Sequence, residues 1–160
     1  MSATAQQYYV GGDISMLPKY EQAGVDYKDK DGNTVQPLQF FGQQGLNAMR
    51  VRLFVNPSGS GDKAVCQDID FVKTLGKRIK DAGMKLMLDF HYSDTWADPK
   101  KQWTPDAWKS LSNDQLYVKI YEYTKDCLQK MADAGATPDF IQTGNEISYG
   151  MMWGSEAAAK

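Results

Sequence analysis

The segment MKLMLDFH, residues 84–91, alternates apolar and polar side chains along its length. An alternation of period two predicts a β-strand with two chemically different faces. One face would be apolar and suited to lie under helices, consisting of Met84, Leu86, Leu88 and Phe90. The other face would carry Asp89 and His91. A doubly wound open sheet favours apolar residues on both faces. The pattern therefore favours the inside of a parallel α/β barrel, with internal ion pairs of no catalytic role as the alternative.

Three other segments have the character of strands, and helical segments separate them. We expect these strands at residues 8–13, 47–55 and 137–146. The second of them repeats the two-faced pattern, with Arg50 and Arg52 opposite an apolar set. Short helices are expected at residues 16–24 and 38–45, and longer ones at residues 68–83 and 114–134. Strands that alternate with helices of this length predict a parallel sheet with right-handed crossovers.

The overall composition narrows the class of protein. A chain of 160 residues is long enough for one domain with a real core. The formal net charge of −2 gives no reason to expect a nucleic-acid or anionic-membrane partner. No apolar run reaches the ~18 residues of a membrane span. Nine Tyr and four Trp, many of them in expected loops, suggest a flat polar ligand such as a sugar, although core and interface packing would explain them equally well.

The two cysteines, Cys66 and Cys127, are predicted to be free thiols. Cys66 would lie near the carboxyl ends of the strands, just before a helix. Cys127 lies well inside the longest helix, ~20 Å farther down a barrel at 1.5 Å of rise per residue. A disulfide requires Cα atoms within about 7 Å of each other.

The expected carboxyl ends of the strands carry the polar residues from which a site could be built. Function in parallel α/β barrels gathers at these ends. The residues found there are Asp13, Arg50, Arg52, Asp89, His91, Asn145 and Glu146. His91 is the only histidine, and its place at a strand end between two aspartates favours a functional role. A single His without HxxxH or CxxC spacing gives no metal-site prediction.

The dipeptide Asn145-Glu146 at a strand end suggests the acid/base carboxylate of a sugar hydrolase. Glycoside hydrolysis needs one carboxyl group that gives its proton to the leaving oxygen. The retaining version of the reaction needs a second carboxylate about 5–5.5 Å away as the nucleophile. The dipeptide alone is a weak signal, because it occurs often by chance.

Four longer strings in chain order carry a much stronger signal. They are GGDIS at 11–15, MRVRLFVNP at 49–57, LDFHYSDTWADP at 88–99 and GNEISYGMMWG at 144–154. Together they closely resemble the glycoside hydrolase family 53 endo-β-1,4-galactanases, also called arabinogalactan endo-β-1,4-galactosidases. The resemblance covers essentially the whole chain. It implies a (β/α)8 TIM barrel, of which residues 1–160 would be the N-terminal half of the catalytic domain, with roughly the first four strands and three helices.

The resemblance also implies an activity and roles for particular residues. The activity would be retaining endo-hydrolysis of β-1,4-galactosidic bonds in (arabino)galactan, the side chain of pectin. Glu146 would be the acid/base, and Asn145 would hydrogen-bond the 2-hydroxyl of the reacting sugar. Arg50 would lie beneath the nucleophile and hold that carboxylate ionised. His91 and Asp13 would line the cleft.

Aromatic and polar loop residues complete the expected sugar site. Trp96 and Trp153 would be platforms on which sugar faces stack, because the apolar C–H face of galactose favours flat rings. Ser93 and Asp94 are further candidates for substrate contact. Packing within loops is the expectation for the remaining tryptophans, Trp103 and Trp108.

The family's nucleophile is a second glutamate on the seventh strand, beyond residue 160, so none is assigned in this chain. We expect the chain alone to be inactive unless another segment completes the barrel. A half barrel would expose two sheet edges, and open edges promote self-association or the binding of a second fragment. No cofactor is expected here, although the missing half of the barrel could hold calcium. The C-terminal GSEAAAK, residues 154–160, is interpreted as the start of a native helix rather than a helical spacer.

Two alternatives stay open. One is another polysaccharide hydrolase of the same clan, such as a cellulase, mannanase or xylanase, and the other is a catalytically inert galactan-binding or assembly fragment. The N-terminal sequence MSATAQQYY lacks the features of a signal peptide, so either the protein is cytosolic or a signal has been removed. Because a polymeric substrate lies outside the cell, we expect a secreted or periplasmic protein from which the signal has been removed.

Overall fold

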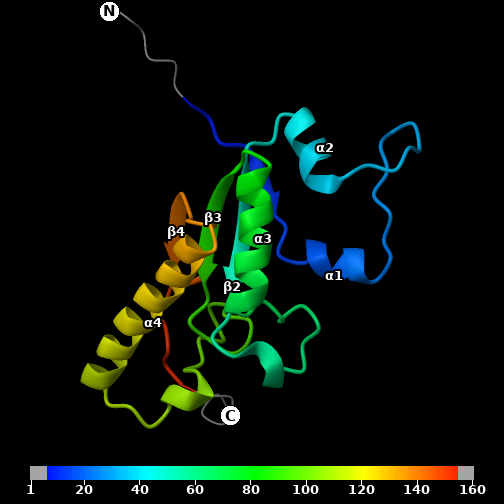
Figure 1. The fold of residues 1–160 in the computed structure, drawn as a ribbon. Helices are drawn as coiled ribbons and strands as arrows, with labels where there is room; N and C mark the ends of the chain where they lie inside the picture. Colours follow the sequence, from blue (N-terminus) through cyan, green and yellow to red (C-terminus); the bar gives the residue numbers. More distant parts are fainter. Residues whose placement is uncertain (1–6, 155–160) are drawn as a thin grey trace, which may run out of the picture.

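A computed structural model describes residues 7–154 and contains one four-stranded parallel sheet. The strands are β1 (Gly11–Asp13), β2 (Ala48–Leu53), β3 (Lys85–Phe90) and β4 (Phe140–Thr143). Their order in the sheet is β1-β2-β3-β4, with every neighbouring pair parallel (Figure 1). The interpretation of GSEAAAK as a helix start falls almost entirely on residues 155–160, outside the described residues.

All four expected strands are present, and each is shorter than predicted. Residues 8–10 precede β1, and Asn47 bonds them through its side chain as well as its backbone N–H, which donates to the Val10 carbonyl at 2.8 Å. Asn47 Oδ1 accepts the Val10 N–H at 2.8 Å, and its Nδ2 donates to the Tyr8 carbonyl at 2.9 Å. At the far end of β4, Gly144 has a φ of 99° and turns the chain out of the strand.

The crossovers contain four α-helices in the described chain, one at each of the four segments where the sequence predicts a helix. They are α1 (Leu17–Gln22), α2 (Pro37–Gln43), α3 (Ile69–Asp81) and α4 (Asn113–Asp133). The first crossover, between β1 and β2, holds both short helices. A turn around Asp29 separates them. Asp29 Oδ1 accepts the backbone N–H groups of Asp31 and Asn33, each at 2.9 Å. Two short 3₁₀ helices, η1 (Pro57–Gly59) and η2 (Asp106–Trp108), lie in the loops after β2 and β3.

The long helices each begin at a side-chain cap. The Asp68 carboxylate accepts the Phe71 N–H at the start of α3, at 2.8 Å. Ser112 and Gln115 form a reciprocal capping box at the start of α4. Glycines with positive φ follow each helix, Gly83 at 77° and Gly135 at 69°.

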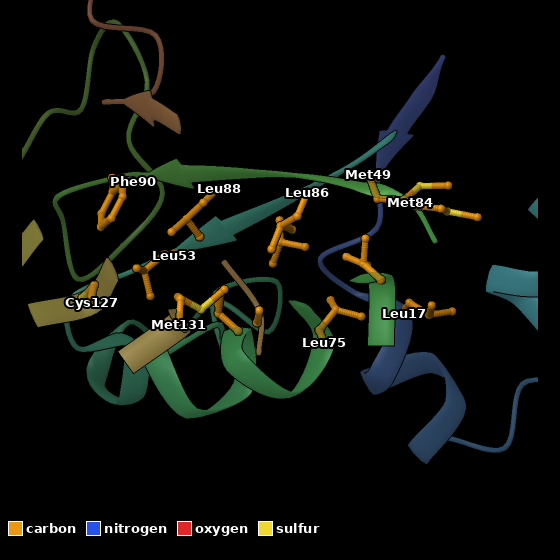
Figure 2. Close-up of a cluster of buried hydrophobic side chains, with 14 of the residues drawn as sticks. Leu17, Met49, Leu53, Leu75, Met84, Leu86, Leu88, Phe90, Cys127 and Met131 are labelled. Carbon is orange, nitrogen blue, oxygen red and sulfur yellow. The ribbon is translucent and has the colours of Figure 1, made fainter. Parts of the chain in front are cut away.

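The apolar faces of β2 and β3 pack against α3 and α4, as the alternation predicts. Figure 2 shows the strand side chains pointing at those of the two helices. Leu86, Leu88 and Phe90 of β3 are completely buried. Leu75 of α3 and Met131 of α4 face them and are also completely buried. This core leaves the opposite face of the sheet for polar residues.

Both thiols are free, which confirms the prediction for the cysteines. Cys127 is buried in the same core cluster as Phe90 (Figure 2). Cys66 is half-buried before α3. Burial raises the pKa of the Cys127 thiol to about 11. The thiol is therefore protonated at neutral pH.

The sheet of the described residues does not close on itself. β1 and β4 are its outermost strands, and each has only one neighbour within residues 7–154. Ile141 of β4 is correspondingly exposed. None of the helices in the same range combines the length and the apolar character needed to cross a lipid bilayer.

Candidate active site

The carboxyl ends of the four strands bring the predicted polar residues to one end of the sheet. In Figure 1, β2 and β3 run toward the lower part of the molecule, where long loops follow them. The register places Asp13 of β1 beside Arg50 of β2, and Arg52 of β2 beside Asp89 of β3. Asn145 and Glu146 follow β4 after one residue, Gly144.

The Arg50 guanidinium is the centre of this cluster. Its Nη1 donates to Asp13 Oδ2 at 3.1 Å, and its Nη2 donates to Asn145 Oδ1 at 2.8 Å. The same Nη2 also pairs with the completely buried carboxylate of Asp89. One guanidinium thus connects β1, β2, β3 and the segment after β4. Its planar fork of donors suits this arrangement better than a lysine would.

His91 lies beneath this cluster. Its Nδ1 accepts the Ala97 N–H at 3.1 Å, so the neutral ring carries its proton on Nε2. That Nε2 is 3.1 Å from Asp89 Oδ2 without being aligned for a hydrogen bond. The ring packs between Phe54 and Trp96, with centroid separations of 4.5 and 5.3 Å. The His91 side chain is only 1% exposed in the described part of the chain, so its neighbours separate it from the predicted cleft.

Several buried polar atoms in this cluster have no hydrogen-bond partner among residues 7–154. They are Asp89 Oδ1, His91 Nε2 and Arg52 Nε. A buried polar atom without a partner costs about 1–3 kcal/mol, so native structures contain few of them. Their concentration at the predicted site is what a pocket built for a polar ligand would show.

Asn145 is buried and held by several hydrogen bonds. Its Oδ1 accepts from Arg50, and its Nδ2 donates to the Ala97 carbonyl at 2.7 Å. Its own carbonyl accepts from Gln102 Nε2 at 2.6 Å. Of the two Nδ2 protons, one is used in the bond to Ala97. The other can therefore be given to a sugar hydroxyl.

Glu146 follows Asn145 in the left-handed region of backbone space. Its φ is 51°, which is uncommon for residues other than glycine and frequent at functional sites. The residue is exposed, and its carboxylate makes no hydrogen bond or ion pair within residues 7–154. A rigid Asn145 thus precedes a free carboxylate, which is an arrangement able to exchange protons with a ligand.

The two predicted platform tryptophans differ in what covers them. Trp96 is half-buried, and the Arg52 guanidinium lies over its ring at 4.7 Å from the centroid. Trp153 is 41% exposed, and its backbone N–H donates to the Gln102 carbonyl at 3.0 Å. Trp108 is buried against Tyr123, which confirms loop packing for that residue. Trp103 is half-buried, with the Lys101 ammonium over its ring.

Ser93 and Asp94 organise loops in this structure. Ser93 is buried, and its carbonyl accepts the Val55 N–H at 2.9 Å. Asp94 Oδ1 accepts the Asn56 N–H at 3.0 Å, and its Oδ2 accepts the Asp106 N–H at 2.8 Å. Both carboxylate oxygens of Asp94 are therefore engaged with the protein backbone. Contact of either residue with substrate stays a prediction.

An open hollow of about 460 Å³ lies next to Arg50. Asp13, Arg50, Arg52 and Trp96 line it together with aromatic residues of the first crossover, Tyr20, Tyr27 and Phe41. A concave surface with aromatic walls and a few charged groups suits a sugar unit. No group of three His, Cys, Asp or Glu side chains in the described ranges could hold a metal ion.

Sequence reasoning missed Gln102, which contacts both Asn145 and Trp153. A lone glutamine in a polar loop has no periodicity or motif to distinguish it. Only the folded chain reveals that it is 3% exposed and bonded across the site.

Comparison with known proteins gives a consistent result. The sequence model described as glycosyl hydrolase family 53 matches residues 9–160. The chain is 41% identical over 146 residues to an arabinogalactan endo-β-1,4-galactanase of Thermothelomyces thermophilus, and 40% identical over 151 residues to a probable one of Aspergillus terreus. These alignments cover 91% and 94% of this chain but 42% of each relative.

Solved structures agree with the sequence matches. The family 53 catalytic domain of Ignisphaera aggregans superposes with a TM-score of 0.84 at 35% identity, covering 92% of this chain and 42% of that one. A fungal β-1,4-galactanase structure superposes with a TM-score of 0.83 at 40% identity, covering 91% and 42%. The four parallel strands are thus half of the (β/α)8 barrel that the sequence predicts. The chain spans about two fifths of the length of the relatives it matches.

Proposed function

The chain belongs to glycosyl hydrolase family 53, and we propose that residues 1–160 form the N-terminal half of the catalytic domain of an endo-β-1,4-galactanase. The reaction would be retaining hydrolysis of β-1,4-galactosidic bonds in (arabino)galactan, as in the degradation of pectin side chains. One observation carries the proposal most directly. The free Glu146 carboxylate follows the immobilised Asn145 at the carboxyl end of β4, where a barrel hydrolase holds its acid.

Glu146 would act first as a general acid and then as a general base. Its carboxyl group gives a proton to the leaving glycosidic oxygen while the nucleophile attacks the anomeric carbon. In the second step it takes a proton from the water that releases the covalent sugar. The nucleophile would be a carboxylate beyond residue 160, about 5–5.5 Å from Glu146 in the closed barrel.

Arg50 and Asn145 would prepare the site for these steps. A guanidinium beside the nucleophile favours its ionised form. Arg50 is already oriented by Asp13 and Asp89, so little reorganisation would be needed. The free N–H of Asn145 would bond the 2-hydroxyl of the reacting sugar, where such bonds strengthen in the transition state.

The substrate would lie across the end of the sheet. Trp153 offers an exposed ring to a sugar face, and Trp96 lines the hollow next to Arg50. We assign Asp13 to the wall of the cleft. We assign His91 to the support of Asp89. Ser93 and Asp94 would then contribute by holding the loops that carry Trp96.

The setting of the enzyme follows from its substrate. We propose a secreted or periplasmic location, because a polysaccharide is hydrolysed outside the cytoplasm. The unpaired edges of β1 and β4 would be covered by the rest of the barrel, supplied by a second segment or by association. Calcium binding in that part of the barrel stays a prediction.

A hybrid enzyme tests the function. Residues 1–160 replace the matching N-terminal part of the Thermothelomyces thermophilus galactanase, and reducing-sugar release from linear β-1,4-galactan is measured. We expect turnover by the hybrid, and Glu146→Gln should reduce it about 10²–10⁴-fold. The isolated chain should release no sugar, because it lacks a nucleophile.

The same hybrid assayed on cellulose, mannan and xylan as well as galactan decides between the remaining alternatives. Cleavage of cellulose, mannan or xylan in preference to galactan would overturn the galactanase assignment. Full activity of the Glu146→Gln hybrid would overturn the acid/base assignment. A folded hybrid without turnover that still binds galactan would indicate the inert binding fragment.

A further inference from the structure

We propose that Gln102 is a positioning residue that holds the acid/base of this site in place. This inference rests on the proposed role of Glu146. Gln102 lies in the loop between β3 and α4, more than forty residues before Glu146 in the chain. Its side-chain amide donates to the Asn145 carbonyl at 2.6 Å, and the Glu146 carbonyl lies 3.5 Å from the same nitrogen.

The peptide that Gln102 holds needs a fixed partner. The Asn145 carbonyl belongs to the peptide bond that joins Asn145 to Glu146, so its direction sets where the Glu146 side chain begins. Glu146 occupies the left-handed region, which costs an L-residue about 1–2 kcal/mol. A conformation of that cost persists only when the surroundings impose it. A buried amide bonded to the preceding carbonyl is such a constraint.

Gln102 bonds a second part of the same segment through its backbone. Its carbonyl accepts the Trp153 N–H at 3.0 Å, in addition to the side-chain bond to Asn145. One residue therefore fixes both ends of the segment 145–153, which carries the acid/base at one end and the exposed tryptophan at the other. Gln102 thus sets the spacing between the proton donor and the surface on which a sugar would stack.

Neighbouring residues in the same loop reinforce this connection. The Ala97 carbonyl accepts from Asn145 Nδ2 at 2.7 Å. Thr104 Oγ1 donates to the Met152 carbonyl at 2.8 Å, and the Thr104 N–H donates to the Gly154 carbonyl at 3.0 Å. Gln102 is the only one of these three loop residues whose side chain bonds the peptide next to Glu146. It is therefore the one whose removal should move Glu146 most directly.

The chain offers a matched control in Gln67. Gln67 is also completely buried, and its Nε2 also donates to a backbone carbonyl, that of Ser15 at 3.1 Å. It lies before α3, and its side chain bonds Cys66, Ser15 and Met16 rather than residues 145–153. Gln102→Met and Gln67→Met each remove a buried amide of the same kind at nearly constant volume. If both variants lose a similar amount of stability, any further difference between them reports the effect of Gln102 on Glu146.

The test uses the full chain and nuclear magnetic resonance. In the unmodified chain, the Gln102 side-chain amide should exchange with deuterium at least about tenfold more slowly than that of the exposed Gln129. In Gln102→Met, the Glu146 and Trp153 amide signals should shift, and the Trp153 amide should exchange about tenfold faster. In Gln67→Met, both signals should stay where they are. Fast exchange of the Gln102 amide, or equal shifts in both variants, would overturn the inference.

Turnover in the hybrid enzyme gives a readout that general destabilisation does not move. Well below the unfolding temperature, Gln102→Met should lower kcat about 10- to 100-fold with KM changed less than about threefold, because misplacement by about 1 Å is enough for such a loss. Gln67→Met should keep both parameters. If Glu146→Gln abolishes turnover but Gln102→Met does not lower kcat, the inference fails alone. If Glu146→Gln keeps turnover, the proposed function fails, and the exchange experiment still judges the contact.

Discussion

The two ends of the sheet are each held by one charged residue with three partners, and they differ in what they leave unsatisfied. At the amino end of β4, the Asp139 carboxylate accepts from Lys80 at 2.6 Å, from Lys85 at 2.8 Å and from the Leu86 N–H at 2.9 Å. At the carboxyl end, the Arg50 guanidinium donates to Asp13, Asp89 and Asn145. The first set of contacts is partly exposed, whereas Asp89 in the second is completely buried.

The two sets of contacts also differ in the polar atoms around them. The Asp139 contacts use flexible lysines near solvent and leave no buried polar atom without a partner among them. The Arg50 contacts adjoin three buried polar atoms that have none in the described chain, Asp89 Oδ1, His91 Nε2 and Arg52 Nε. Barrel enzymes place catalysis at the carboxyl end and stability at the amino end. In the half barrel, the unpartnered polar atoms lie at the carboxyl end and the Asp139 contacts at the amino end.

The largest difference between the two ends of the sheet is expected when Arg50 is replaced. In Arg50→Met, the buried Asp89 carboxylate loses its counter-charge, and we expect the free energy of unfolding to fall by about 3–5 kcal/mol. Urea denaturation of the full chain measures the change. Arg50→Met combined with Asp89→Asn should recover part of the loss, because no buried charge then remains unpaired. Equal stability of Arg50→Met and the unmodified chain would mean that water reaches Asp89.

A second test asks whether backbone packing rather than charge holds the edge strand. A Cβ added at Gly11 would lie 1.5 Å from the Ala48 carbonyl oxygen, whereas one at Gly12 would meet nothing within 4 Å. Gly11→Ala should therefore push β1 away from β2 and cost about 1–3 kcal/mol or more, as overpacking does. Gly12→Ala is the control and should cost less. Thermal unfolding compares the two, and equal losses would contradict the close approach of β1 to β2.

The smallest expected effect is at Asp139. Although burial alone would raise its pKa, hydrogen bonds from Lys80, Lys85 and Leu86 hold the pKa of Asp139 well below its ordinary value of 3.8. Its stabilising contribution is therefore complete above about pH 4 and is lost as the pH falls through the lowered pKa. Asp139→Asn should cost about 1–2 kcal/mol at pH 7.

Acid titration of stability checks the sign of this effect. The gap in unfolding free energy between the unmodified chain and Asp139→Asn should narrow as the pH falls below about 4. Because the site residues are at the other end of the sheet, the hybrid enzyme should keep its kcat in Asp139→Asn. A gap that widens in acid would contradict the lowered pKa.

The parts of the fold set by alternation were predictable. The two-faced patterns of residues 47–55 and 84–91 place Leu86, Leu88 and Arg50 correctly, because side chains in a strand point to opposite faces in turn. The four strands and the half barrel are confirmed for the same reason. The strand ends then bring Asp13, Arg50 and Asn145 together, as expected of parallel strands.

The parts set by single long-range contacts were not predictable. The side chain of Asn47 bonds the backbone of Tyr8 and Val10, almost forty residues earlier, and such bonds follow no period. Arg52 lies over Trp96, and Gln102 bonds Asn145, across distances in sequence that only folding closes. Propensity and motif describe neighbours in the chain, whereas these contacts depend on which loops meet.

The order of strands in the sheet is the same as their order in the chain, which has a consequence for synthesis. Each strand pairs with the one made just before it, so a chain leaving the ribosome can add β2 to β1, β3 to β2 and β4 to β3 without waiting for later residues. In such vectorial growth each new strand pairs with the edge left by the strand before it, while the outer edge of β1 stays unpaired. Such growth would bring Arg50 and Asp89 together before the Asn145-Glu146 pair had been translated.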